Sequence, residues 1–312
     1  MSEIVNRTAS EIKDMKIRGA GRIARAGASA LGEFAKDYKG GSLDEFQKDL
    51  DEARSILLGS RPTAVSLWNG VQASIRDVKK AASLEEAKGS VIKNSGSFVE
   101  SSSNAVETIA KIGARRVQDG DVIMTHCNSS AALGVIKEAH EQGKRIKVYA
   151  TESRPWRQGL ITVKELSEAG VDITLIIDSA VRSVMKNVDK VFVGADTVTS
   201  NGALVNKIGT SQLALAANEA RVSFNVCTET YKFSPMTMFG DMVTIEERDH
   251  DEVVAKGTIP DNVKIFNPVF DSTPAKYIDT IITELGVMSP GSVYDVMIRQ
   301  LGENVFDIGG KE

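Results

Sequence analysis

Apolar runs of strand length alternate with helical stretches through the second half of the chain, beginning after Gln118-Asp-Gly120. The alternation predicts a mostly parallel sheet with helices on both faces, because helical crossovers join parallel strands and cover them on both sides. The strands are predicted at 122–126, 146–151, 173–177, 190–193, 223–227 and 263–267, and the helices at 131–142, 159–169, 179–187 and 210–220.

The first part of the chain has no convincing strand, and its apolar residues follow helical spacing. Amphipathic stretches at 44–58, 84–92 and 100–112 predict separate helices. A length of 312 residues is enough for two domains. We therefore predict an α/β protein with a helical domain over residues 1–115 and a sheet domain over residues 116–312.

Charge and cysteine content exclude several classes of protein. The net charge of −4 argues against a general nucleic-acid binder. Cys127 and Cys227 are the two cysteines, a hundred positions apart, so neither a disulfide framework nor a Cys-x-x-Cys metal site is expected. The first residues contain no signal-peptide core, and no apolar run is long enough to span a membrane. We expect a soluble cytoplasmic protein that binds neither nucleic acid nor membrane.

The stretch Asp121–Ala131 is the predicted centre of the sheet domain. A buried strand ends on Thr125-His126-Cys127, and Asn128-Ser129-Ser130 are residues that cap helices. Ligands of open α/β sheets bind where strands end, and free N–H groups of a helix's first turn attract phosphate. A cysteine facing a helix N-terminus can have a lowered pKa. Cys127 is therefore a candidate base or nucleophile.

A second candidate follows the strand at 190–193. Asp196 comes after Gly194-Ala195, whose small side chains leave room beside it, and its carboxylate could be the acid or base that complements Cys127. Asn201-Gly202 between β-prone runs predicts a hairpin at 197–207. That hairpin would return Asn206 and Lys207 towards the same edge of the sheet.

Several other residues have ordinary structural explanations. Asp178 is predicted to cap the following helix, Cys227 to be a buried small hydrophobe, and His126 to be structural. Gly19–Ala24 fits Gly-x-Gly-x-x-Ala, but a dinucleotide site requires a preceding strand, and residues 11–17 read as helical. A metal site is not expected, because the three histidines of the chain lack ligand spacing. Most lysines and arginines are expected to be solvated; Arg18, Arg61, Arg154, Lys207 and Lys232 lie near Gly, Pro or turn signals.

Eight segments together resemble one superfamily over nearly the whole chain. It holds the alpha, beta and delta subunits of translation initiation factor 2B, the methylthioribose-1-phosphate isomerases and the archaeal ribose-1,5-bisphosphate isomerases. The resemblance implies an N-terminal helical domain and a Rossmann-like catalytic domain. The segments are Arg18-Gly-Ala-Gly21, Ser60-Arg-Pro-Thr63, Thr125-His-Cys-Asn-Ser-Ser130, Thr151-Glu-Ser-Arg-Pro155, Gly194-Ala-Asp196, Asn206-Lys-Ile-Gly-Thr210, Tyr231-Lys-Phe233 and Asn267-Pro-Val-Phe-Asp-Ser-Thr-Pro274.

Within that superfamily the chain resembles the enzymes. The isomerases keep a cysteine and an aspartate, matched by Cys127 and Asp196, whereas the alpha subunit lacks the cysteine and typically carries Glu at the second position. Methylthioribose-1-phosphate isomerases usually have Pro where this chain has Gly21. The several cations also suit a substrate with two phosphates. The archaeal ribose-1,5-bisphosphate isomerases are thus most similar; a methylthioribose-1-phosphate isomerase and a non-catalytic regulatory subunit remain alternatives.

The resemblance also implies roles for individual residues. Cys127 and Asp196 would carry acid–base catalysis through an enolate-like intermediate, without metal or other cofactor, in archaeal AMP and nucleoside salvage. AMP would be a possible activator, and the chain a homo-oligomer, at least a dimer and by family pattern a hexamer. The substrate-binding residues would be Arg18, Gly19, Ala20, Gly21, Arg61, Ser129, Ser130, Ala131, Asn206, Lys207 and Lys232, with Arg154 as a further contact.

Overall fold

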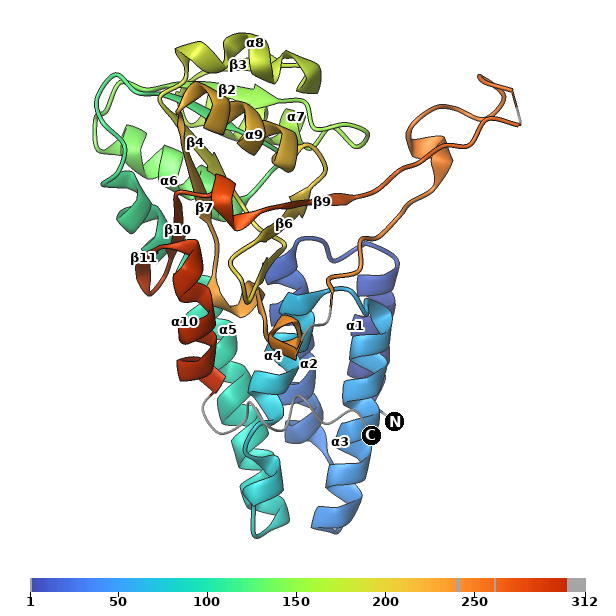
Figure 1. Cartoon of the computed structure of the whole chain (residues 1–312). Helices are drawn as coiled ribbons and strands as arrows, with labels where there is room; N and C mark the ends of the chain where they lie inside the picture. The colour runs from blue at the N-terminus through green and yellow to red at the C-terminus, as the bar shows by residue number, and fades with distance from the viewer. Residues whose placement is uncertain (1, 240–241, 261, 302–312) are drawn as a thin grey trace. The chain divides into compact units, whose positions relative to one another are not determined.

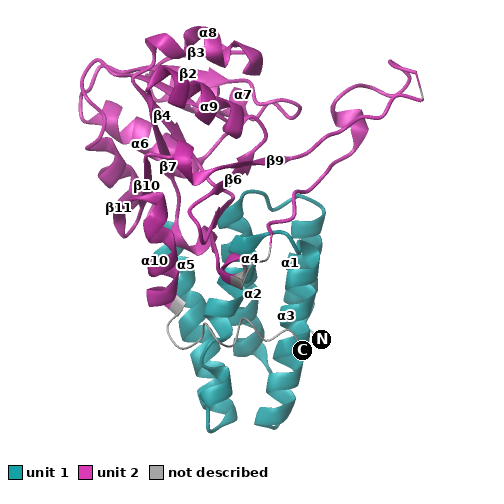
Figure 2. Ribbon diagram, viewed as in Figure 1, with its two compact units in different colours: residues 1–104 teal, residues 105–312 magenta. Residues whose placement is uncertain are grey.

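The computed structural model describes residues 2–239, 242–260 and 262–301. The chain divides into two compact units, residues 1–104 and 105–312 (Figure 2). Helix α5, Leu84–Ala114, runs through that division. The domain boundary expected at residues 115 and 116 directly follows the end of this helix and stays a prediction.

The first unit is helical, as predicted (Figure 1). Its amphipathic helices bury large side chains such as Ile12, Leu31 and Leu57, and Phe34 stacks on Phe46 with ring centroids 5.9 Å apart. Apolar residues at helical spacing produce this single core. The elements before α5 are α1 (Glu3–Lys13), α2 (Ala20–Asp37), α3 (Leu43–Ser60), α4 (Val65–Ile75) and the 3₁₀ turn η1 (Val78–Lys80).

Helix α5 corrects the expectation of separate helices at 84–92 and 100–112. The Ser- and Gly-rich residues between them have modest helix propensity, which suggested a break. Ser95 and Ser102 are instead buried, and their hydroxyls donate to the carbonyls of Val91 and Val99 one turn earlier. Packing of this buried face keeps the helix continuous, and the back-bonds give the buried hydroxyls their acceptors.

The second unit contains a seven-stranded sheet in the order β11-β10-β7-β4-β1-β2-β3. Neighbouring strands are parallel except β10 and β11. Among the described helices, none is both long and apolar enough to span a bilayer. The strands are β1 (Val122–Thr125), β2 (Lys147–Thr151), β3 (Asp172–Ile176), β4 (Lys190–Val193), β7 (Ser223–Cys227), β10 (Thr280–Thr283) and β11 (Gly286–Met288), and the helices α6 (Ser130–Glu141), α7 (Gly159–Glu168), α8 (Val181–Val184), α9 (Thr210–Ala220) and α10 (Val293–Leu301).

The sheet confirms the predicted strands from 122 to 227 but not the last one. Residues 263–267 form no strand, and Val263 and Phe266 are exposed, so this apolar run is not covered by helices. The next parallel strand is β10, where only Ile281 and Ile282 are apolar, too short a run to stand out. The helix expected at 179–187 is broken into the short α8 between the turns η2 (Asp178–Ala180) and η3 (Met185–Asn187).

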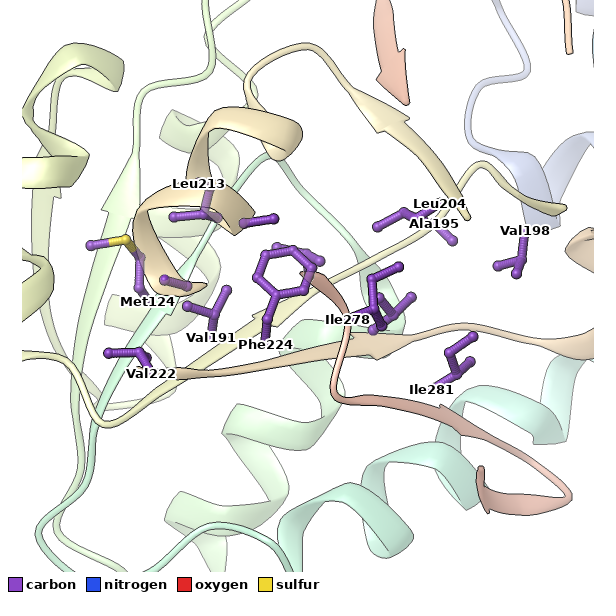
Figure 3. Packing of buried hydrophobic residues seen from close by; sticks show 14 of the residues in the cluster. Met124, Val191, Ala195, Val198, Leu204, Leu213, Val222, Phe224, Ile278 and Ile281 are labelled. Atoms are coloured by element: carbon purple, nitrogen blue, oxygen red, sulfur yellow. The ribbon is translucent and has the colours of Figure 1, made fainter. Parts of the chain in front are cut away.

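Two apolar layers cover the sheet because successive strand residues face opposite sides. On one side Met124, Val191 and Phe224 pack with Leu213 of α9 (Figure 3). On the other side Ile123 and Phe192 pack with residues of α6, and Cys227 lies in that second cluster. Both faces of the central strands are therefore buried, and this burial fixes the register in which the strands pair.

The predicted hairpin is present as β5 (Thr197–Thr199) and β6 (Leu204–Lys207). Gly202 adopts φ +78°, a conformation that glycine accepts without strain. The hairpin belongs to a second sheet in the order β8-β5-β6-β9, with β8 at Phe233–Ser234 and β9 at Phe270–Thr273. The remaining short turns are η4 (Thr230–Lys232), η5 (Pro235–Phe239), η6 (His250–Glu252), η7 (Ala275–Tyr277) and η8 (Pro290–Ser292).

Candidate active site

The strand order places the candidate residues on two adjacent strand ends. From β1 the chain proceeds to β2 and β3 on one side, whereas β4, β7 and β10 lie on the other. The order therefore reverses between β1 and β4, and ligands of open α/β sheets bind at the carboxyl ends of the strands that flank such a reversal. Cys127 follows β1 there, and Asp196 follows β4.

The ends of β4 and α6 touch directly. A side-chain carbon on Gly194 would lie 2.2 Å from Ser129 Oγ, so only glycine permits this approach. Ser129 is the N-cap of α6, and its hydroxyl accepts a hydrogen bond from Ala132 N at 3.4 Å. Ser130 is exposed as the first residue of the helix, and Ala131 is buried. The three proposed substrate ligands 129–131 thus form the first turn of α6, where anions are favoured.

Hydrogen bonds from two other elements hold the main chain at Cys127. Its φ of +67° is left-handed, uncommon for a residue with a side chain. Cys127 N donates to Ser153 Oγ at 2.8 Å, and Cys127 O accepts from Thr162 Oγ1 at 2.7 Å. Asn128 reaches the same Thr162 Oγ1 and Glu165 Oε1, each at 3.2 Å. These bonds fix a conformation that would otherwise be strained.

The Cys127 thiol has a raised pKa. Burial is the main cause and takes the pKa to about 11, against the lowering effects of the Lys207 charge and of the Asn128 N–H. The carboxylates of Asp196 and Asp178 raise the pKa further. The expectation of a lowered pKa was wrong, because loss of solvation outweighs the cation and the N–H donor. Asp196 and Lys207 nevertheless lie close enough for their charges to act on the thiol.

The hairpin connects Asp196 to Lys207. Asp196 N donates to Val205 O at 3.1 Å, so the segment that follows β4 is bonded to β6. Lys207 is the last residue of β6, and its ammonium lies 5.1 Å from the ring centroid of Phe270. Both residues are half-buried. The main chain thus brings a carboxylate and a cation to the edge where Cys127 lies.

Asn206 is buried and supports the start of α9. Its amide donates to Thr210 Oγ1 at 3.0 Å, and that hydroxyl donates to Lys207 O at 2.6 Å. Asp271 accepts from Gly209 N and Ser211 N, and burial raises the pKa of Asp271 to about 6. The proposed contact between Asn206 and substrate stays a prediction.

Lys232 forms a buried ion pair rather than standing alone. Its ammonium lies 2.7 Å from Glu229 Oε2, and Tyr231 Oη donates to Glu229 Oε1 at 2.9 Å. Burial tends to raise the pKa of Glu229, but the Lys232 charge and the hydrogen bonds outweigh it, so the pKa is lowered. Whether Lys232 also binds phosphate stays a prediction.

The N-terminal candidates belong to the first unit. Arg18 Nε donates to Met15 O at 2.8 Å, and Arg61 Nη1 lies 3.9 Å from Met15 Sδ, so both guanidinium groups approach one residue. Gly19 has φ +86° at the N-cap of α2, which Ala20 and Gly21 open. Helix α1, not a strand, precedes them; it ends at Lys13, so the helix predicted over residues 11–17 is confirmed only in its first three residues. Their contact with substrate stays a prediction.

Asp178 does not cap α8, contrary to the prediction. The N-cap of α8 is Ala180, and the carboxylate of Asp178 instead accepts from Ser153 N at 2.8 Å and Arg154 N at 2.7 Å. The ends of β2 and β3 are neighbours, so this carboxylate reaches the adjacent loop before its own helix. It holds Ser153 at φ +59°. Arg154 Nη2 donates to Val253 O at 2.9 Å, and its proposed substrate contact stays a prediction.

His126 is buried, and both ring nitrogens have partners. Nδ1 lies 2.6 Å from Thr151 Oγ1, and Nε2 lies 2.8 Å from Ile208 O. This agrees with the structural role expected for it. Thr151, Ser153 and Thr162 were missed as parts of the site; each lies near the end of β2 or on α7, and only side-chain contacts distinguish them from other buried hydroxyls.

The pattern that defines the initiation factor 2 subunit family matches residues 16–290 of this chain. The chain is 52% identical to a ribose 1,5-bisphosphate isomerase of Archaeoglobus fulgidus over 302 residues, covering 97% of this chain and 95% of the relative. It is 37% identical to a methylthioribose-1-phosphate isomerase of Thermosipho africanus, covering 94% and 88%. A crystal structure of translation initiation factor eIF-2B from Pyrococcus horikoshii OT3 matches with a TM-score of 0.79 and 34% identity, covering 93% of this chain and 98% of that one.

Proposed function

This chain belongs to the initiation factor 2 subunit family, and we propose that it is an isomerase that converts ribose 1,5-bisphosphate to ribulose 1,5-bisphosphate. The observation that carries the proposal is the placement of Cys127 and Asp196 on either side of the strand-order reversal, with Lys207 within electrostatic reach. A thiol and a carboxyl group so placed can exchange protons with opposite ends of one small substrate.

The reaction requires four proton transfers, and two residues suffice for them. In the first half, the Cys127 thiolate removes the proton on C2 while the Asp196 carboxyl protonates the ring oxygen. The bond from C1 to that oxygen breaks, a C1–C2 double bond forms, and an enol phosphate results. In the second half, the Asp196 carboxylate removes the O2 proton and the Cys127 thiol protonates C1. The ketose forms, and both residues return to their starting protonation states.

The raised pKa of the Cys127 thiol defines how this cycle starts. With a pKa of about 11, the thiol is protonated at neutral pH in the protein alone. The cycle therefore requires the thiol to lose its proton first, and its starting pair is the Cys127 thiolate with the Asp196 carboxylic acid. The Lys207 charge favours the thiolate. Exclusion of water by bound substrate would strengthen these interactions during removal of the weakly acidic C2 proton.

Two groups of residues would hold the two phosphates. Residues Ser129, Ser130 and Ala131 offer the first turn of α6, and Lys207 adds a cation beside it. The other proposed substrate contacts are Asn206 of β6 and Lys232 of η4 and, in the first unit, Arg18, Gly19, Ala20, Gly21 and Arg61. The second phosphate distinguishes this substrate from methylthioribose 1-phosphate.

Proton NMR of the chain mixed with each substrate tests the proposal. Loss of the anomeric C1 signal of ribose 1,5-bisphosphate and growth of ketose signals would support it. Turnover of methylthioribose 1-phosphate alone would favour the second isomerase reaction, which the lower identity of 37% to that relative disfavours. Inertness towards both sugars, with binding to initiation factor 2, would instead identify a regulatory subunit.

We further propose a metabolic role, an activator and an oligomeric state for this enzyme. The reaction would serve AMP and nucleoside salvage, AMP would raise its rate, and the active form would be a homo-oligomer, with six copies as the expected size. Light scattering measures the assembly directly. Turnover at fixed substrate with and without AMP measures the activation, and an unchanged rate at saturating AMP would contradict it.

A further inference from the structure

Side-chain hydrogen bonds connect the Cys127 turn to the segment that follows Lys207. Ser153 Oγ accepts from Cys127 N at 2.8 Å and lies 3.2 Å from Thr151 Oγ1. Thr151 Oγ1 lies 2.6 Å from His126 Nδ1, whose ring reaches Ile208 O through Nε2 at 2.8 Å. The three side chains in between are all buried. The chain of bonds therefore runs through the interior from one functional segment to the other.

The two ends of the chain of bonds, and the need of each buried hydroxyl hydrogen for an acceptor, fix which ring nitrogen carries the hydrogen. The main-chain N–H of Cys127 can only donate, and the main-chain carbonyl of Ile208 can only accept. Nε2 of His126 must therefore carry a hydrogen, because a bare nitrogen would face the carbonyl oxygen. Ser153 has accepted from Cys127, so its own hydrogen goes to Thr151 Oγ1 or to Nδ1, at 3.4 Å. Thr151 then donates to Nδ1, which is bare.

We propose that His126 is a positioning residue, held as the neutral Nε2–H tautomer, that fixes Lys207 relative to the Cys127 thiol. This inference rests on the proposed isomerase function, in which the Lys207 charge stabilises the thiolate. Ile208 directly follows Lys207, and Ile208 N donates to Val269 O, so a bond to Ile208 O restrains the main chain from which the ammonium extends. His126 directly precedes Cys127, which makes one ring the link between base and cation.

The residues around His126 restrict both the position and the protonation of its ring. A side-chain carbon on Gly209 would lie 2.9 Å from His126 Cε1, and Gly209 has φ +102°, so glycine is required on both counts. Asp178 and Lys207 are the charged groups that act on the ring, and they oppose one another. Burial is the larger effect and lowers the pKa of His126. A proton on Nδ1 would also reverse the Thr151 hydroxyl and leave the Ser153 hydrogen without this acceptor.

Nitrogen-15 NMR of histidine-labelled protein tests the tautomer directly, without any assay of turnover. We expect one bare and one protonated ring nitrogen, the proton on Nε2, unchanged between pH 8 and the usual imidazole pKa of about 6.5. Loss of the signals in His126→Asn assigns them among the three histidines. A proton on Nδ1, or an imidazolium at pH 7, would overturn the proposal even if the isomerase activity is confirmed.

A matched pair at Thr151 tests the positioning role. Thr151→Val removes the hydroxyl but keeps the shape, and Thr151→Ser keeps the hydroxyl. We expect kcat of the valine variant to fall about tenfold with KM changed less than twofold, and the serine variant to stay near wild type. Equal kcat values for both variants, or a change confined to KM, would contradict the role.

His126→Asn addresses the other end of the link. Its shorter side chain can accept from Thr151 but cannot reach Ile208 O, so Lys207 loses its restraint. We expect KM for ribose 1,5-bisphosphate to rise about tenfold in addition to any loss in kcat. An unchanged KM would show that the bond to Ile208 does not position the cation. Absence of turnover in the wild-type protein would reject the proposed function and leave the tautomer measurement to decide this inference.

Discussion

The carboxyl ends of β1 and β7 have similar composition but offer different chemistry. Each strand of the same sheet is followed or ended by a cysteine and then by polar residues, Cys127-Asn-Ser-Ser130 in one case and Cys227-Thr-Glu229 in the other. Cys227 is fully buried, whereas Cys127 is half-buried. Burial raises the pKa of both thiols, and the Glu229 carboxylate raises that of Cys227 further.

The two cysteines differ in exposure because Cys127 lies two residues beyond its strand, whereas Cys227 is still part of its own. Cys227 is the last residue of β7, pairs with Ile282 of β10 and points into the core cluster of Ile123 and Phe192. Cys127 comes two residues after the end of β1, where a left-handed φ takes its side chain out of the alternation of the strand. In this sheet, the cysteine whose thiol is available for chemistry is the one that lies beyond the hydrogen-bonded part of its strand.

Replacing each cysteine by alanine is the strongest test of this comparison. We expect Cys127→Ala to lower kcat about a thousandfold, because the proton-transfer group is lost. Cys227→Ala should keep turnover and lower the free energy of unfolding by about 1 kcal/mol through a small cavity. Turnover by NMR and urea unfolding measure the two effects. Full activity of Cys127→Ala, or loss of activity in Cys227→Ala alone, would reverse the assignment.

The β7 end is expected to contribute stability through the pair of Glu229 and Lys232. Lys232→Met leaves a buried carboxylate without its partner and should lower the free energy of unfolding by about 3 kcal/mol. The double variant with Glu229→Gln removes the charge as well and should recover part of that loss. Urea unfolding at one fixed protein concentration compares them. A single variant as stable as wild type would mean that the pair is not stabilising in the folded protein.

Alkylation by iodoacetamide should distinguish the two thiols within one sample. The Cys127 rate should rise about tenfold per pH unit from pH 7 to 9, below its pKa of about 11, because the thiolate is the reactive form. Cys227 should stay unmodified until the protein unfolds. Lys207→Met should slow labelling of Cys127 by several-fold, since the cation lowers that pKa. Peptide mass spectrometry reports each site, and equal labelling of both cysteines would refute the comparison.

The smallest expected effect is the pH dependence of stability from His126. Burial lowers its pKa in the folded protein. The unfolded chain therefore binds the proton more readily, and stability falls as pH drops below about 6.5, by at most about 1.4 kcal/mol per pH unit. Asp271 acts in the opposite direction, because its raised pKa of about 6 favours the folded state at low pH.

Comparison with His126→Asn separates the two contributions. The difference in unfolding free energy between wild type and variant should shrink as pH falls from 7 to 5, while the Asp271 contribution cancels. Urea unfolding at each pH gives that difference. A constant difference over this range would show that His126 is not held neutral in the folded protein.

The periodic part of the fold was predictable from sequence, because buried parallel strands and their helices repeat a simple pattern. Strands from 122 to 227, the hairpin at Asn201-Gly202 and the position of Cys127 after β1 all follow from local signals. Strand β10 was missed because two isoleucines make too short a run, and Asp178 was misassigned because its partners lie on a neighbouring loop. Contacts between distant segments carry no local signal.

The hydrogen bonds that join Ser153, Thr151 and His126 are contacts of this kind between distant segments. Thr151 and Ser153 lie in one of the eight segments that resemble the superfamily, but neither spacing nor composition predicts their hydrogen bonds. Their role follows from distances between β1, β2 and the start of α9. The proposed roles of Arg18 and Arg61 depend in the same way on contacts that no local pattern encodes, and they stay predictions.

The pairing of β6 with β9 has a consequence for the order of folding. Hairpin β5–β6 can form locally, but Lys207 pairs with Phe270, which closes a long loop. Closing a long loop costs chain entropy before the new contacts add any stability, so such pairings form late. The hydrogen bonds that hold the Cys127 turn come from residues after β2 and β3 and from α7, all closer in sequence than Lys207 is to Phe270. A newly synthesised chain would thus form the turn that holds Cys127 before it positions Lys207. It would become active only when β6 pairs with β9.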